Sequence, residues 1–124
     1  MRRSLYIGRF QPFHEGHEAI VNELLAAGKN VLIALRDTPI DDENPYTLQE
    51  RADRIRTYFP DTERVAIMAI PDIEEAVYGR DVGYGIREIR LAPELEAVSA
   101  SDIRRVGKLA PEHRVATSYA RSAS

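Results

Sequence analysis

The chain begins with an alternation of apolar runs and amphipathic stretches. Two largely apolar runs, residues 4–7 and 30–35, flank the stretch 18–27, in which apolar residues recur at helical spacing. Apolar runs that do not alternate with polar residues are typical of parallel strands covered on both faces. Gly28 follows the amphipathic stretch and predicts the end of a helix. Strand, helix and strand with short joints predict a parallel βαβ unit with a right-handed crossover.

The second half of the chain continues this pattern and then departs from it. The stretch 46–58 has helical spacing and opens with Thr47 and Glu50 in the spacing of a capping box, and the run 64–70 predicts a third strand. The stretch 86–91 alternates apolar and charged residues, which predicts an edge or half-exposed strand. A parallel crossover alone needs about a dozen residues, so a complete extra βα unit cannot fit between these two runs. We therefore predict an α/β fold, a compact Rossmann-like parallel sheet flanked by helices and reduced in its second half.

Composition places the chain among ordinary globular proteins. Its 124 residues are 44% hydrophobic and 30% charged, which suits a single domain over residues 1–124 with a frayed tail over residues 116–124. The net charge of −3 argues against nucleic-acid binding, and the absence of cysteine excludes thiolate chemistry and cysteine-ligated metals. No apolar stretch approaches the ~20 residues of a membrane span. We expect a cytoplasmic protein that binds neither nucleic acid nor membrane.

One stretch, residues 8–17 (GRFQPFHEGH), concentrates the candidate chemistry. It lies between the first predicted strand and the first predicted helix, and Arg9 stands near its start. His14 and His17 are three residues apart, so they share a helix face if the helix begins near His14. Helix N-termini carry unpaired N–H groups and partial positive charge, so this arrangement favours an anion such as phosphate. The alternative is that the two histidines only cap and pack the helix.

A protein-held metal is not expected, because the chain has only three histidines, the third being the distant His113, and no cysteine. A second polar cluster lies late in the chain, where Ser99 and Ser101 precede Arg104. Either serine is a good N-cap. Hydroxyls, free N–H groups and a guanidinium would then meet at another helix start; the alternative is an ordinary cap with solvent-facing arginines.

These stretches resemble the signatures of a known superfamily. GRFQPFHEGH resembles the first motif of the HxGH nucleotidyltransferases, in the spelling of the nicotinamide-mononucleotide (NMN) adenylyltransferase branch of archaea and phages. Residues 98–105 (VSASDIRR) resemble the superfamily's ISxTxxR motif, and residues 44–51 (NPYTLQER) resemble the branch's NPFTxxER element. The resemblance runs over residues 5–109 and implies a Rossmann-like nucleotidyltransferase.

The resemblance implies a role for each matching residue. His14 and His17 contact the triphosphate, with His17 at the α-phosphate in the transition state, and Arg9 and Arg104 hold the β- and γ-phosphates. The implied nucleotide-binding residues are Gly8, Phe10, Gly16, Ser99 and Ser101. Mg²⁺ accompanies ATP or CTP and is held mostly by water and phosphate oxygens. For Arg51 a structural role and a phosphate-facing role both stay open.

Two segments outside the main motifs are further candidates. Gly79 and Arg80 lie in the glycine-rich segment 78–85, which forms turns between short strands or wraps the nucleotide. The segment 37–45 is acidic and has two prolines, so it cannot be a helix or an interior strand. It is either a solvated loop or a lid over the site.

The expected reaction is transfer of a nucleotidyl group, AMP from ATP by preference, to a phosphorylated small-molecule acceptor with release of pyrophosphate. NMN is the nearest acceptor by resemblance, although the chain has no tryptophan and lacks the extra helix and strand that this branch usually carries. A cytidylyltransferase that uses CTP and a small phosphorylated alcohol is one alternative. A non-catalytic nucleotide-binding module is another. Sheet edges left by a shortened fold favour a homo-oligomer.

Overall fold

The computed structural model describes residues 1–79, 83, 85–91 and 93 of the chain. In this part strands and helices alternate in the order β1 (Ser4–Gly8), α1 (Glu15–Ala26), β2 (Val31–Asp37), α2 (Leu48–Tyr58) and β3 (Val65–Pro71). The strands form a parallel sheet in the order β1-β2-β3, with Ser4, Val31 and Val65 side by side. This confirms the predicted Rossmann-like α/β fold. Neither helix of the described part is long and apolar enough to cross a bilayer.

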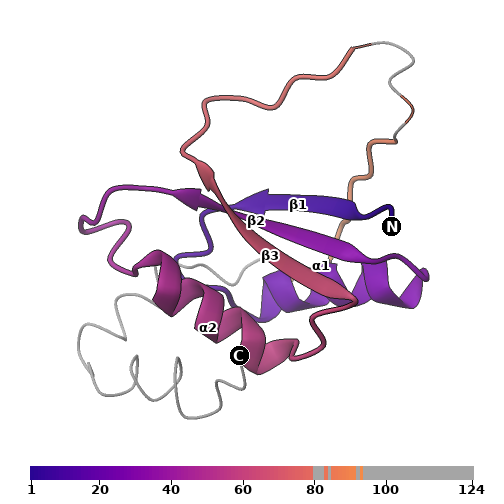
Figure 1. Cartoon of the computed structure of the whole chain (residues 1–124), viewed down its shortest axis with the longest axis horizontal. Coiled ribbons are helices and arrows are strands. Elements are labelled where there is room, and N and C mark those ends of the chain that lie inside the picture. Colours follow the sequence, from indigo (N-terminus) through magenta and orange to yellow (C-terminus); the bar gives the residue numbers. More distant parts are fainter. Residues whose placement is uncertain (80–82, 84, 92, 94–124) are drawn as a thin grey trace.

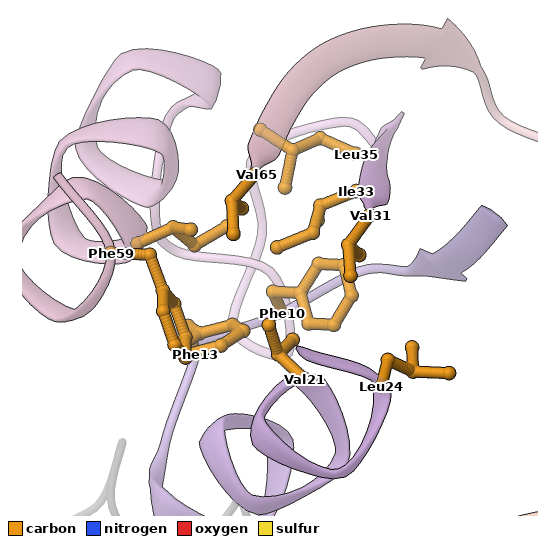
Figure 2. Close-up of a cluster of buried hydrophobic side chains, with 10 residues drawn as sticks. Phe10, Phe13, Val21, Leu24, Val31, Ile33, Leu35, Phe59 and Val65 are labelled. Carbon is orange, nitrogen blue, oxygen red and sulfur yellow. The ribbon is translucent and has the colours of Figure 1, made fainter. Parts of the chain in front are cut away.

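Both helices lie on the same face of the sheet, below it in the view of Figure 1. A single cluster of apolar side chains fills the space between the helices and the sheet (Figure 2). Its members are Val31, Ile33, Leu35 and Val65 from the strands, Val21 and Leu24 from α1, Ile55 from α2, and Phe10, Phe13 and Phe59 from adjoining segments. Burying one such side chain is worth about 1.5–3 kcal/mol, so this cluster is the main source of stability in the described part.

The opposite face of the sheet is more exposed. Neighbouring residues of parallel strands share a face, so Leu5 lies beside Leu32, and Met68 lies beside Ala34. Leu5 is 59% exposed and Met68 is 45% exposed. Among the described residues, the predicted flanking by helices is therefore observed on one face of the sheet.

Local signals set the end of α1 and the start of α2 where the sequence predicted them. Gly28 follows α1 with a φ of 78°, and its N–H donates to the carbonyl of Leu25 at 3.0 Å, which is a left-handed glycine cap. At the start of α2 the N–H of Thr47 donates to Glu50 Oε1 at 2.9 Å, and the N–H of Glu50 donates to Thr47 Oγ1 at 3.0 Å. This is the predicted capping box.

The strand predicted over residues 86–91 is wrong, because these residues adopt no strand structure. Ile89 packs against the core, whereas Ile86 is 69% exposed. An alternating pattern becomes a strand only where a neighbouring strand completes its hydrogen bonds, and the described sheet has three strands without it. Arg2 Nη2 donates to the carbonyl of Gly83 at 2.9 Å, so Gly83 lies close to the beginning of β1.

Candidate functional site

The loop between β1 and α1, residues 9–14 (the histidine loop), leaves the carboxyl edge of the sheet and ends at His14, while His17 lies in the first turn of α1. It turns at Phe10, which has a φ of 51°, and contains a cis peptide bond between Gln11 and Pro12. A Cβ added at Gly8 would lie 2.8 Å from Cζ of the Phe10 ring, and that ring is held in the core. Packing therefore requires glycine at position 8. Phe10 is 3% exposed, so its ring packs in the core and is not accessible to a ligand.

His14 and His17 cap the first turn of α1 reciprocally. The N–H of Gly16 donates to His14 Nδ1, and the N–H of His14 donates to His17 Nδ1, each at 3.1 Å. The two rings stack, with centroids 3.8 Å apart and planes 25° apart. Because both Nδ1 atoms accept a hydrogen bond, each neutral ring carries its proton on Nε2. Each ring therefore keeps one N–H donor that the helix cap does not use.

Both imidazoles are neutral at pH 7. Burial lowers the pKa of His14 to about 4, with a further contribution from the positive charge of Arg54. Burial, followed by the neighbouring His14, lowers the pKa of His17 to about 3. The pair therefore offers two neutral hydrogen-bond donors rather than two cations.

Aromatic rings surround His17 and fix its orientation. The centroid of the His17 ring lies 4.9 Å from that of Phe10, 5.3 Å from that of Phe13 and 6.3 Å from that of Tyr6. Aromatic pairs of this kind are worth about 0.5–1.5 kcal/mol each beyond the area they bury. Burial also raises the pKa of Tyr6 to about 12, so its hydroxyl is uncharged beside the site at neutral pH.

Arg9 is exposed and is oriented by the acidic loop that follows β2. Its Nη1 donates to Asn44 Oδ1 at 3.0 Å. The N–H and the Nδ2 of Asn44 donate in turn to Asp41 Oδ1 at 2.8 and 3.0 Å, and the bond from the Asn44 side chain is the largest cause of the lowered pKa of Asp41. This loop therefore has a contact role in addition to being exposed, since Asn44 holds the side chain of Arg9, a predicted phosphate-binding residue. Its action as a lid stays a prediction.

Two buried polar residues tie the histidine loop to the rest of the fold. Arg51 is 1% exposed, and its Nη1 donates to the carbonyl oxygens of Arg9 at 2.7 Å and Arg36 at 2.9 Å. Gln11 pairs with the backbone of Tyr46 in both directions, at 3.1 and 3.0 Å. Of the two roles considered for Arg51, structural or phosphate-facing, its contacts support the structural one. The role of Gln11 was missed, although a glutamine within an otherwise apolar part of the loop signals a buried polar contact.

Arg54 is a cation of the site that the sequence reasoning also missed. Its Nε donates to the carbonyl of Phe13 at 2.5 Å, in the residue before His14, and its charge contributes to the low pKa of His14. The available signal was helical spacing: Arg54 follows Arg51 by three residues on α2, so both arginines share the helix face that meets the histidine loop.

The remaining predicted site residues fall into two groups. Gly16 is buried in the first turn of α1, whereas Gly79 is exposed, and no hydrogen bond within the described part joins it to the histidine loop. The others lie outside the described residues: Arg80, Ser99, Ser101 and Arg104. The convergence of Arg104 with the histidine pair therefore stays a prediction.

The chemistry of the assembled donors suits an anion. The histidine N–H groups and the guanidinium groups of Arg9 and Arg54 are all hydrogen-bond donors, and charge-assisted bonds from arginine to phosphate are among the strongest in proteins. The described residues contain no group of three histidine, cysteine or acidic side chains placed to hold a metal ion. These donors therefore have the character of groups that bind phosphate at a helix N-terminus.

Comparisons with known proteins agree with this character. The Nicotinamide-nucleotide adenylyltransferase of Methanocorpusculum labreanum is 43% identical over 53 residues, which cover 41% of this chain and 32% of the relative. The corresponding protein of Methanospirillum hungatei is 31% identical over 80 residues, which cover 62% of this chain and 46% of the relative. The chain thus matches less than half the length of these curated relatives.

A solved structure shows the same fold. The crystal structure of a bifunctional NMN adenylyltransferase/ADP-ribose pyrophosphatase from Francisella tularensis, complexed with AMP and a manganese ion, matches with a TM-score of 0.51 and 32% identity, over 58% of this chain and 23% of that one. The sequence profile of the family described as cytidylyltransferase-like matches residues 5–81, a span that includes both helices, the histidine loop and all of the three strands except Ser4. The chain belongs to the cytidylyltransferase-like family of nucleotidyltransferases.

Proposed function

We propose that this protein transfers AMP from ATP to a phosphorylated small-molecule acceptor, with NMN as the first candidate, and releases pyrophosphate. The observation that carries the proposal is the stacked pair of neutral imidazoles, His14 and His17, at the N-terminus of α1. The preference for ATP and NMN is supported by the similarity to nicotinamide-nucleotide adenylyltransferases.

The proposed reaction needs no protein nucleophile. An oxygen of the acceptor phosphate attacks the α-phosphorus of ATP and forms the new P–O bond, while the bond to the bridging oxygen breaks and its electron pair leaves with pyrophosphate. Catalysis of such a step consists mainly of positioning and electrostatic stabilisation. Donors that are already in place where negative charge develops are therefore the machinery that this reaction requires.

Each residue of the site has a part in this scheme. The Nε2–H groups of His14 and His17 donate to oxygens of the α-phosphate, where charge gathers in the transition state. Arg9, held by Asn44, binds the β- and γ-phosphates together with Arg104, which lies outside the described residues. ATP enters as its magnesium complex, in which the metal is held by phosphate oxygens and water.

The test is release of pyrophosphate by the purified chain. ATP with NMN is compared with CTP with glycerol phosphate or choline phosphate, and with each nucleotide alone. Pyrophosphate released only with ATP and NMN supports the proposal; release with CTP and a phosphorylated alcohol would assign a cytidylyltransferase instead. His17→Ala is expected to abolish release, and full activity of this variant would contradict the role of the imidazole pair.

A non-catalytic nucleotide-binding module is the second candidate. The observation that favours it is the extent of the similarity, which covers 32% to 46% of the two relatives described above and therefore does not carry their whole activity. ATP binding by calorimetry without pyrophosphate release from any acceptor tested would favour the module over the enzyme.

A further inference from the structure

Three arginines of α2 differ in how their guanidinium groups are used. The guanidinium of Arg51 donates to backbone carbonyls of the histidine loop and of β2. Arg56 does the same at the other end of the helix, where Nη1 donates to the carbonyls of Phe59 at 3.1 Å and Val65 at 2.7 Å. Within the described part of the chain, Arg54 donates through Nε alone. Among the described residues, none bonds to its two terminal nitrogens.

The position of the Arg54 guanidinium follows from that one bond. The group is planar and rigid, so fixing Nε against the carbonyl of Phe13 also fixes the terminal nitrogens within one guanidinium width of the residue that precedes His14. No carboxylate of the described residues forms an ion pair with Arg54. The ion pair in the described part of the chain joins Arg36 to Asp72. A positive charge with free donors therefore stands beside the histidine pair without a counter-ion from the described chain.

We propose that Arg54 is a phosphate-binding residue, whose terminal nitrogens hold a phosphate group of the nucleotide or of the acceptor beside His14. The inference rests on the proposed function, because it adds Arg54 to the same site. Guanidinium groups bind phosphate through two parallel hydrogen bonds, and the free nitrogens of Arg54 supply that pair of donors. The nucleotide and the acceptor both carry phosphate, so the test separates these two sources.

The experiment measures binding of four probes to the whole chain by titration calorimetry: ATP, inorganic tripolyphosphate, NMN and adenosine. Arg54→Gln is expected to weaken binding of at least one phosphate-bearing probe about tenfold or more, which is the loss of one charge-assisted contact. Weaker binding of ATP and tripolyphosphate assigns the phosphate to the nucleotide; weaker binding of NMN assigns it to the acceptor. Adenosine binding is expected to stay unchanged.

The matched control is Arg56→Gln, which removes the same charge from the same helix. The guanidinium of Arg56 donates to the carbonyls of Phe59 and Val65 instead of the histidine loop. This variant is expected to keep wild-type affinity for every probe at a temperature at which circular dichroism shows it folded. If both variants lost the same affinity for the probes, the effect would come from net charge alone, and the role of Arg54 would be overturned.

A second variant guards against misfolding. Arg54→Lys keeps the charge but replaces the fork by a single ammonium group, so it is expected to weaken the affected probe about threefold or more while the melting temperature stays close to that of the wild type. Wild-type affinity of the folded Arg54→Gln or Arg54→Lys variant for every probe would overturn the inference and leave the proposed function standing. A wild-type chain that bound no phosphate-bearing probe would overturn both.

Discussion

Replacing His14 by asparagine separates the two tasks of this side chain. His14 is the N-cap of α1 and accepts the N–H of Gly16 through Nδ1, while its Nε2–H is the donor proposed for the α-phosphate. Asparagine is among the best N-cap residues, so His14→Asn keeps an acceptor for the helix but loses the imidazole donor. His14→Ala loses both.

General values for a helix cap and for a ring contact give the size of each loss. An alanine at an N-cap costs about 0.5–2 kcal/mol, and loss of the stacked contact with His17 adds about 0.5–1.5 kcal/mol. We expect His14→Ala to be about 1–3.5 kcal/mol less stable than the wild type, and His14→Asn to lose only the stacking part. Removing one donor that stabilises transition-state charge costs about 100- to 1,000-fold in kcat, so both variants should lose that much activity.

Two assays check this prediction. Urea unfolding followed by far-ultraviolet circular dichroism gives the free energy of unfolding of the three proteins, and pyrophosphate release with ATP and NMN gives their kcat. Equal destabilisation of the two variants would refute the capping role of the imidazole. Wild-type turnover by His14→Asn would refute the role of its Nε2–H in transfer.

Three further predictions concern stability. Arg51→Lys should lower the free energy of unfolding by about 2–4 kcal/mol, because one ammonium group cannot replace the bonds to three carbonyl oxygens; a melting temperature within about 2 °C of the wild type would contradict this. The folded pKa values of His14 and His17, about 4 and about 3, lie below their ordinary value of 6.5, so the unfolded chain binds more protons and stability should fall as the pH drops from 7 towards 4. The expected loss is roughly 2 kcal/mol at pH 5, allowing for partial exposure; urea midpoints that do not change with pH would refute it, and His14→Asn should show a weaker dependence. Thr38→Val should stabilise the protein by about 1 kcal/mol, since the buried Thr38 Oγ1 has no partner among the described residues; Thr57→Val is the control, expected to destabilise because Thr57 Oγ1 donates to a carbonyl at 2.6 Å.

Features that depend on neighbours in sequence were predictable. The cap formed by Thr47 and Glu50 and the helix end at Gly28 are set by residues within one turn, and both are confirmed. The order of strands and helices followed from the period of the apolar residues, and the common helix face of His14 and His17 followed from their spacing.

Features that depend on distant residues were not predictable. The bonds that hold the histidine loop join Arg9 to Asn44, Gln11 to Tyr46 and Arg54 to Phe13, which are 35, 35 and 41 residues apart. Periodicity carries no information about such contacts. The same reason explains the wrong strand at residues 86–91, whose alternating pattern specified a face but no strand to pair with.

The reciprocal cap of α1 means that the histidine rings reach their working orientation when the protein folds. Their Nδ1 atoms are engaged by backbone N–H groups, so a ligand that binds to the Nε2–H groups does not have to immobilise freely rotating side chains. The entropy of ordering such side chains, about 0.5–1.5 kcal/mol each in a mobile site, is lost during folding instead of during the encounter with nucleotide. The site is in this sense preorganised, and its affinity depends on the start of one helix remaining intact.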